Sequence, residues 1–418
     1  MSNEDHPPVL SVPAAAPAPP GSPAPRPSLG RLAFLGLGRN LGLIAVSAFF
    51  FNLAFSMQTG IFTNFIVEDL HILPAQVGLL ESVREFPGLF TVLLAAATFM
   101  FAQSTLGGLC LIVTGIGFAL QGQAGGFWPL VWVTLLMSSG MHLFFPAHST
   151  LILHHSPPGR KAASLGAVNS VFAAASLVGL AAVFFLARFV SFRSVFTLCG
   201  VLILGGAVAL FMLPREKGVG RRRSLVLRRR YGVYYLLNML SGGRRHVYLT
   251  FARFALVQLF GLPVTTMVAL QGAGSAMQVL TRPMMGRIID RFGERRVLMI
   301  NYSVLAVLYL GYAFLHYLPL VCVIFILDQL MVDFDMAQTT YLDKIAPPED
   351  LAPTLSAGGT FNHITAVAVP FLGGLVWQAA GSAVTFCGGS VLALMSVAAA
   401  SRIRVRERAA AAGTSAHA

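Results

Sequence analysis

Long apolar runs recur from residue 41 to residue 402 and are separated by short polar segments. A helix needs about 20 apolar residues to cross the hydrocarbon core of a bilayer, and many of the runs approach that length. The chain of 418 residues is 56% hydrophobic and only 11% charged, whereas soluble globular domains carry about 25% charged residues. The short alternating segments typical of a transmembrane β-barrel do not occur. The sequence therefore predicts an all-α polytopic membrane protein.

The apolar runs predict about twelve transmembrane helices in two bundles of six. The first bundle is predicted to contain spans at 41–67, 75–99, 105–122, 127–152, 162–188 and 193–213. The second is predicted to contain spans at 231–260, 264–287, 297–315, 317–342, 353–379 and 381–401. The complete predicted organisation is a disordered N-terminal tail at 1–40, bundles at 41–213 and 231–402, a linker at 214–230 and a tail at 403–418.

Basic residues gather in alternate connections between the spans. The net charge is +13, and much of the excess lies in the linker, at Arg221–Arg223 and Arg228–Arg230, and in the C-terminal tail. Basic loops stay on the cytoplasmic side of a membrane. We therefore predict a multi-pass protein of the cytoplasmic (inner) membrane with both termini in the cytoplasm. The charge then requires no nucleic-acid partner, and the four scattered cysteines predict neither a disulfide framework nor a zinc site.

The two predicted bundles repeat a pattern. Leu73-Pro74 corresponds to Leu262-Pro263, at an offset of 189 residues, and Pro157-Pro158 corresponds to Pro347-Pro348 at an offset of 190. A repeated offset between several short matches indicates a duplicated six-helix unit.

The segment Gly286–Arg296 joins two spans of the second bundle and is rich in charge. We expect its first glycine to let the helix end approach a neighbour, and its aspartate to cap the following helix. The second glycine permits a left-handed turn, and the arginines hold the loop in the cytoplasm. The positions that carry this pattern, G-x-x-x-D-R-x-G-x-R with one further arginine, are Gly286, Asp290, Arg291, Gly293, Arg295 and Arg296.

This loop and the internal repeat resemble the major facilitator superfamily of secondary transporters. The resemblance implies two six-helix halves that rock about a central site, and most often a monomer. It also implies a cavity lined mainly by the first, fourth, seventh and tenth helices. The first half departs from the family pattern, because residues 97–107 lack the equivalent aspartate and arginines. The glycine-proline motif of family antiporters is also missing from the fifth helix.

Ionisable residues inside the predicted spans are the candidates for function, because each is costly at membrane depth. The seventh span carries the substrate-binding candidates Arg244, Arg245, His246 and Arg253. Arginine suits the carboxylate or phosphate of an anion. Two alternatives are that these arginines pair with acids on neighbouring helices, or that they lie at the membrane interface. Gly242 and Gly243 are expected to let the helix bend.

Acids in two other spans are candidates for proton coupling. Glu81 and Glu85 share a helix face with their candidate charge partner Arg84. The tenth span carries Asp328, Asp333 and Asp335. A buried carboxylate can take up and release a proton near neutral pH. The alternatives are a structural ion network for the first group and a salt bridge to Arg244 or Arg245 for the second.

Further polar residues could line the same cavity or pack within the bundle. The weaker substrate-binding candidates are Asn52, Gln58, His142, His148, Asn362 and His363. Metal ligation by His142 and His148, with methionines and Asp335 of the tenth span, is a competing interpretation. We expect the arginines to repel a bare cation and predict no metal site and no cofactor.

These features predict a transporter and no enzyme. There is no Gly-Lys-Ser/Thr phosphate loop, so an ion gradient is the expected energy source. We predict secondary transport of a small organic anion by alternating access, coupled to protons, with the lipid bilayer as a further partner. The alternatives are efflux of a toxic or drug-like compound, transport of a metal or metal chelate, and a membrane assembly factor that transports nothing.

Overall fold

The computed structural model describes residues 37–90, 101–215 and 227–404. Within these residues the chain forms twelve helical rods, six in each half. The first six are α1 (Arg39–Asn64) with the π-helix η1 (Phe65–Asp69), α2 (Pro74–Leu89), α4 (Gln103–Gln121), α5 (Phe127–His155), α6 (Lys161–Leu186) and α7 (Phe192–Phe211). The second six begin with a rod of η2 (Arg229–Tyr231), α8 (Gly232–His246), the π-helix η3 (Val247–Ala252) and α9 (Arg253–Gln258). They continue with α10 (Val264–Phe292), α11 (Glu294–Phe314), α12 (Leu318–Met331) with η4 (Val332–Asp335) and α13 (Met336–Ile345), α14 (Pro348–Ala380) and α15 (Ser382–Ala400).

The predicted all-α fold with two six-helix bundles is confirmed. Eight of the helices in the described residues are long and apolar enough to cross a membrane. The four other rods contain α2, α8, α10 and α12, and they carry ionisable residues along their length, such as Arg84, Arg244, Arg282 and Asp328. Four predicted segments lie wholly or partly outside the described residues. They are the N-terminal tail up to residue 36, the end of the second predicted span, the linker residues 216–226 with Arg221–Arg223, and the C-terminal tail from residue 405.

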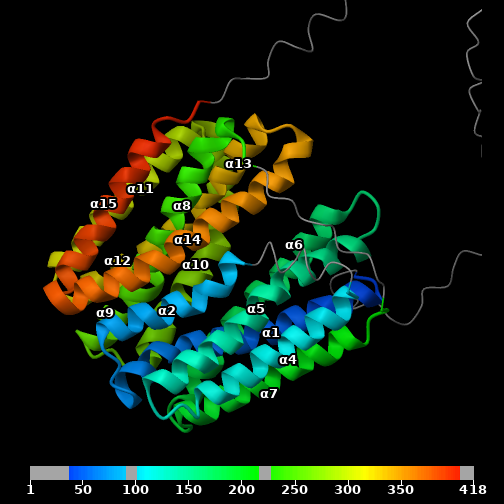
Figure 1. Ribbon diagram of the computed structural model, residues 1–418, viewed down its shortest axis with the longest axis horizontal. Helices are drawn as coiled ribbons and strands as arrows, with labels where there is room; N and C mark the ends of the chain where they lie inside the picture. The colour runs from blue at the N-terminus through cyan, green and yellow to red at the C-terminus, as the bar shows by residue number, and fades with distance from the viewer. Residues whose placement is uncertain (1–36, 91–100, 216–226, 405–418) are drawn as a thin grey trace, which may run out of the picture.

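Each half has its own apolar core. In the first half, the rings of Phe51 and Phe144 lie 4.8 Å apart between α1 and α5. In the second, Trp377 of α14 packs against Phe254 of α9, with ring centroids 5.3 Å apart. Figure 1 shows the two bundles side by side, with α2 lying between α14 and the rest of the first bundle. This arrangement brings the charged face of α2 to the centre of the molecule.

The two halves touch through a small set of helices: α2 contacts α14, α6 contacts α10, and α1 contacts α9 and α10. The α2–α14 contact is close because glycine stands on both sides. A Cβ atom at Gly78 would lie 2.2 Å from the carbonyl oxygen of Pro370, and one at Gly374 would lie 2.7 Å from that of Pro74. The Ser82 hydroxyl adds a 2.7 Å hydrogen bond to the Val367 carbonyl.

Further contacts between the halves lie at the end of the molecule where α1 leads into α2. Asn64 donates a hydrogen bond to the Leu262 carbonyl at 2.9 Å, and the Ala75 amide donates to Gln378 at 3.2 Å. We call this the α1–α2 end. The other end carries Arg160 between α5 and α6 and Arg291 in the last turn of α10, and we call it the basic end. The halves are thus joined from the α1–α2 end to the middle of the rods.

Replacing Gly78 by valine is expected to separate the halves at the α1–α2 end. The added side chain cannot fit against Pro370, and overpacking of this kind costs roughly 1–3 kcal/mol. Spin labels at the exposed residues Leu73 and Ala379, in a background without the native cysteines, would report the separation by pulsed electron paramagnetic resonance. An unchanged label distance in the Gly78 variant would contradict this account, and valine at the uncrowded Gly272 serves as the control.

The loop at Gly286–Arg296 is only partly as expected. Gly293 joins α10 to α11 with a φ of 77°, the conformation for which glycine was predicted. Among the described residues, no neighbouring atom stands within 4 Å of a Cβ at Gly286, so the close helix approach expected there is wrong. The expected cap is also not formed, since Asp290 is exposed and no side chain caps α11. Glu294 instead anchors the loop, through a 2.6 Å ion pair with Lys344 of α13.

Candidate functional site

Charged residues of α2 lie at the centre of the molecule. Arg84 pairs with Glu81 at 2.5 Å and with Glu85 at 3.4 Å, as their shared helix face predicted. All three side chains are largely buried. Each acid therefore has a local partner that lowers the cost of its burial, and Glu85 in addition reaches residues of the second half.

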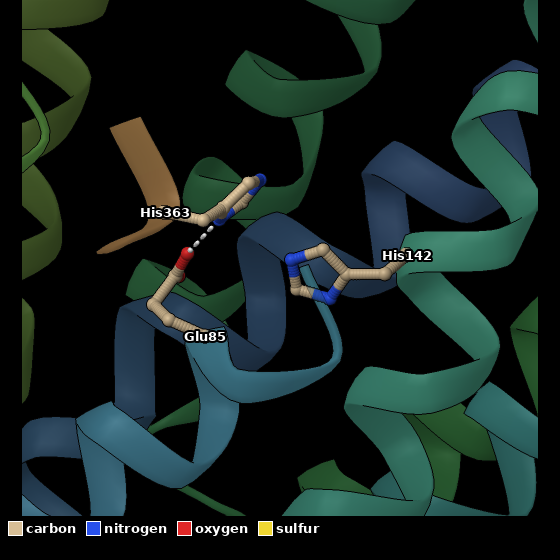
Figure 2. Close-up of side chains that lie close together, drawn as sticks. All are labelled: Glu85, His142 and His363. Carbon is tan, nitrogen blue, oxygen red and sulfur yellow. Dashed lines mark hydrogen bonds and ion pairs between the residues drawn. The ribbon is translucent and has the colours of Figure 1, made fainter. Parts of the chain in front are cut away.

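Glu85 joins the two halves. One carboxylate oxygen lies 3.2 Å from Nδ1 of His363 in α14, and the other lies 3.8 Å from Nε2 of His246 in α8. His142 of α5 approaches the same point, with its ring centroid 5.3 Å from that of His363 (Figure 2). We call Glu85, His142, His246 and His363 the central cluster. It contains ligand types that bind transition metals, and it brings together residues 278 positions apart in the chain.

Two histidines of the central cluster are held by polar residues one helical turn away. Nδ1 of His142 lies 3.0 Å from the carbonyl oxygen of Ser138 and 2.9 Å from its hydroxyl. Nδ1 of His246 lies 3.1 Å from the hydroxyl of Thr250. The sequence interpretation missed Ser138 and Thr250. Their signal was the spacing of four residues from a histidine, which places both side chains on one helix face.

The two adjacent arginines of α8 have different surroundings. Arg244 is 3% exposed, pairs with Asp335 at 3.4 Å, and lies 3.9 Å over the ring of Tyr302. Asp335 also accepts hydrogen bonds from Ser241 and Gln338. Arg244 thus has the structural ion pair that was one of the two alternatives.

Arg245 is exposed, although it lies midway along the rod that begins at Arg229 and ends at Gln258. Among the described residues it forms neither a hydrogen bond nor an ion pair. Farther along the same rod, Arg253 lies 5.6 Å over the ring of Tyr248 and within electrostatic range of Glu81. Arg245 is therefore the arginine of α8 that remains open to a ligand.

Gly242 and Gly243 serve close packing. A Cβ atom at Gly242 would lie 2.0 Å from the carbonyl oxygen of Asn362 in α14, and one at Gly243 would lie 2.9 Å from Val369. The irregular turn of this rod is instead the π-helix η3, which follows His246 directly. Such turns are frequent at functional sites.

The three acids of the tenth rod are far from equivalent. Asp333 forms a bidentate pair with Arg282, at 3.1 and 3.2 Å, and the Arg282 side chain is 52% exposed. Asp335 belongs to the pair with Arg244. Asp328 is 1% exposed, and neither of its oxygens forms a hydrogen bond of good geometry among the described residues, although the Tyr312 hydroxyl lies beside it. A carboxylate without an ion pair at such a site is strongly disfavoured in its charged form.

The remaining candidates hold neighbouring elements together. His148 lies 3.4 Å from the Ile44 carbonyl and packs on Phe144, away from the central cluster. The side-chain amide of Asn52 donates to the Phe172 carbonyl at 2.5 Å. Gln58 donates to Gln121 at 3.1 Å, and Asn362 donates to the Asn238 carbonyl at 3.1 Å. These contacts join α1, α4, α5, α6, α8 and α14.

Comparison with known proteins supports the same fold. A family model described as Major Facilitator Superfamily matches residues 44–332 and again residues 235–417. No curated protein matches the chain significantly in sequence.

Solved structures of transporters are similar to this chain. The nucleoside transporter NupG superimposes with a TM-score of 0.72 and 12% identity, covering 86% of this chain and 98% of that one. A bacterial homologue of the human lysosomal transporter Spinster, in an inward-facing and occupied conformation, gives 0.70 and 14%, covering 87% and 96%. A POT family transporter in complex with a thioalcohol-conjugated peptide gives 0.67 and 14%, covering 88% and 96%. These likenesses concern the fold. Together with the family model, which spans nearly all of the helical rods, they identify the chain as a member of the major facilitator superfamily of multi-pass membrane transporters.

Proposed function

We propose that this protein is a secondary active transporter that moves a small organic anion across the cytoplasmic membrane in exchange for, or together with, protons. The halves at 41–213 and 231–402 would be the moving bodies, with both termini in the cytoplasm. Membership of a transporter family supports the class of function. The similar structures include transporters of nucleosides and of peptides, which supports a small solute.

Arg245 is the observation that carries the choice of an anion. A guanidinium at mid-membrane is not tolerated in lipid and instead faces a water-filled space. Arg245 has no acid to neutralise it among the described residues, and its planar donors suit a carboxylate or phosphate. Arg84 and Arg253, by contrast, face the acids Glu81 and Glu85. The positive charge of Arg245 is therefore not offset by an acid among the described residues, which favours an anionic ligand.

The contacts between the halves support a conformation open toward the cytoplasm. They extend from the α1–α2 end to the central cluster, and the basic end would face the cytoplasm under the positive-inside rule. The central site would then be reached from the basic end. A transporter of similar fold has been captured in an inward-facing conformation, which is consistent with this assignment.

Arg245→Gln is expected to reduce anion-triggered proton flux by about 10- to 100-fold, because it removes a charge-assisted hydrogen bond worth roughly 1.5–3 kcal/mol. The assay uses purified protein in liposomes that contain a pH-sensitive dye, challenged with pools of organic anions, organic cations and neutral compounds. Arg188→Gln is the matched control, because Arg188 is exposed beyond the end of α6 and lies over Phe184.

Three results would contradict the proposal. Anion-triggered proton flux at the wild-type rate in Arg245→Gln would show that Arg245 does not bind the anion. A response limited to cations or drug-like compounds would favour efflux. If no pool of compounds triggered proton flux in protein that is monodisperse and folded, the result would favour a membrane assembly factor.

A further inference from the structure

We propose that Glu85, His142 and His363 form a binding site for a divalent first-row transition-metal ion, beside a further imidazole, His246, whose Nε2 lies 3.8 Å from Glu85. The site goes beyond the proposed anion transport and does not depend on it. Its ligands come from three helices and from both halves of the molecule: α2 and α5 in the first half and α14 in the second (Figure 2).

The ligand atoms already lie close to one another. One atom from each of Glu85, His142 and His363 lies within 4.8 Å of the others. Zinc binds imidazole nitrogen and carboxylate oxygen at about 2.0–2.2 Å, so that tetrahedral ligands stand roughly 3.4 Å apart. The Glu85–His363 distance of 3.2 Å is already of this size. To complete the set, the ring of His142 would have to come closer by about 1.5 Å.

The orientation of His142 is a second, independent observation. His142 is 8% exposed. The Ser138 hydroxyl donates its proton to the Arg84 carbonyl, and the Ser138 carbonyl can only accept, so Nδ1 of His142 is the donor in this group. Nε2 then carries the lone pair, and Figure 2 shows a ring nitrogen of His142 on the edge that faces Glu85 and His363. Metal-binding histidines are commonly held in this way, by a backbone carbonyl on the other ring nitrogen.

His246 repeats this arrangement from the second half. Its Nδ1 is engaged by the Thr250 hydroxyl at 3.1 Å, and its Nε2 lies 3.8 Å from Glu85. Three imidazoles and one carboxylate form a ligand set suited to zinc, nickel, cobalt or iron, and not to magnesium or calcium, which prefer oxygen.

The nearby arginines oppose a cation less than the sequence suggested. Arg244 faces away, toward Asp335 and Tyr302. Arg84 is shared between Glu81 and Glu85, so these three residues together carry one negative charge. Arg245 is exposed, where solvent screens its charge, although that charge still acts on the adjacent His246. The cluster therefore presents a carboxylate and imidazoles, which are ligand types that bind transition metals.

Because the ligands belong to both halves, metal binding is tied to the conformation in which the halves meet at the centre. A ligand that binds one conformation more tightly shifts the population toward it. The bound ion would hold α2 and α5 against α14 and α8, and its release would accompany their separation.

Cobalt(II) titration of the full-length protein tests the site, because the intensity of the visible absorption of this ion reports its coordination geometry. The protein is purified in detergent with an affinity tag that contains no histidine. We expect one ion per chain, with a tetrahedral or five-coordinate spectrum, displaced by zinc. Glu85→Gln and His363→Gln should each weaken binding by about 100-fold or more, since even loss of an outer partner costs about 10- to 100-fold.

His148→Gln is the matched control, because His148 is a buried histidine on the same helix as His142 but contacts Ile44 and Phe144. It should bind cobalt within about threefold of the wild type. Absence of saturable binding to the wild type would overturn the proposal, and so would equal binding by folded Glu85→Gln or His363→Gln. His363 is the more exposed of these two ligands, so its variant keeps the test valid if Glu85→Gln does not fold. Cobalt binding is measured without substrate. A liposome assay without proton flux would therefore count against the proposed anion transport, whereas an absent cobalt spectrum would count against the metal site.

Discussion

Arg244→Met is expected to lower the free energy of unfolding by roughly 3–5 kcal/mol, the cost of leaving a buried charge without its partner. Arg244 is almost fully buried, pairs with Asp335 and covers the ring of Tyr302. Methionine fills similar space but leaves the Asp335 carboxylate with only the neutral donors of Ser241, Tyr302 and Gln338. Denaturant unfolding of the purified protein in mixed micelles measures this loss.

Two further variants make that measurement specific. Arg282→Met removes an ion pair of the same type, with Asp333, but its side chain is 52% exposed, so we expect a change of about 0–1 kcal/mol. Combining Arg244→Met with Asp335→Leu removes both charges, and this double variant should be more stable than Arg244→Met alone. A single variant that unfolds like the wild type would show that Arg244 has no structural role and would return it to the substrate candidates.

Asp328→Asn is expected to abolish proton-driven concentration of the substrate and to leave exchange of substrate across the membrane intact. Asp328 is 1% exposed, and its polar neighbour among the described residues is the neutral hydroxyl of Tyr312. The cost of a charged carboxylate there favours a bound proton in this conformation. Arg244 is the positive group whose charge reaches it. Movement of the halves that exposes Asp328 or brings it nearer to that charge would release the proton.

The size of the effect follows from the gradient. One proton coupled to one substrate supports about a tenfold concentration ratio for each unit of pH difference. Wild-type liposomes should approach this ratio, whereas Asp328→Asn liposomes should stay near a ratio of one. Asp333→Asn is the control, because Asp333 is paired with Arg282 at an exposed position. Normal accumulation by Asp328→Asn would exclude Asp328 as the coupling residue and leave Glu81 and Glu85 as candidates.

The sequence predicted the helical rods closely. The spans expected at 264–287 and 381–401 correspond to α10 (Val264–Phe292) and α15 (Ser382–Ala400). This accuracy has a simple cause: a spanning helix requires about 20 apolar residues, and its backbone satisfies its own hydrogen bonds. Helix ends that contain polar residues were predicted less accurately. For example, α14 begins at Pro348, before the apolar run at 353–379 from which it was predicted.

The sequence could not predict which residues of different helices contact each other. Glu81, Arg84 and Glu85 were placed on one face because their spacing follows the helical period. Arg244 and Arg245 are adjacent in sequence, yet they point about 100° apart around the helix, so one is buried against Asp335 and the other is exposed. The sequence interpretation gave both the same candidate role.

What the sequence determined by itself was therefore local or repetitive: the number of rods, the duplicated halves, the left-handed glycine at Gly293 and the charged face of α2. The tertiary structure alone decided which charges are paired and which remain available. The central cluster joins Glu85 to His142, His246 and His363, and its geometry depends on how four helices are rotated and how closely α2 packs on α14. That packing is set by contacts between glycines and backbone atoms far apart in the chain, and no local pattern encodes it.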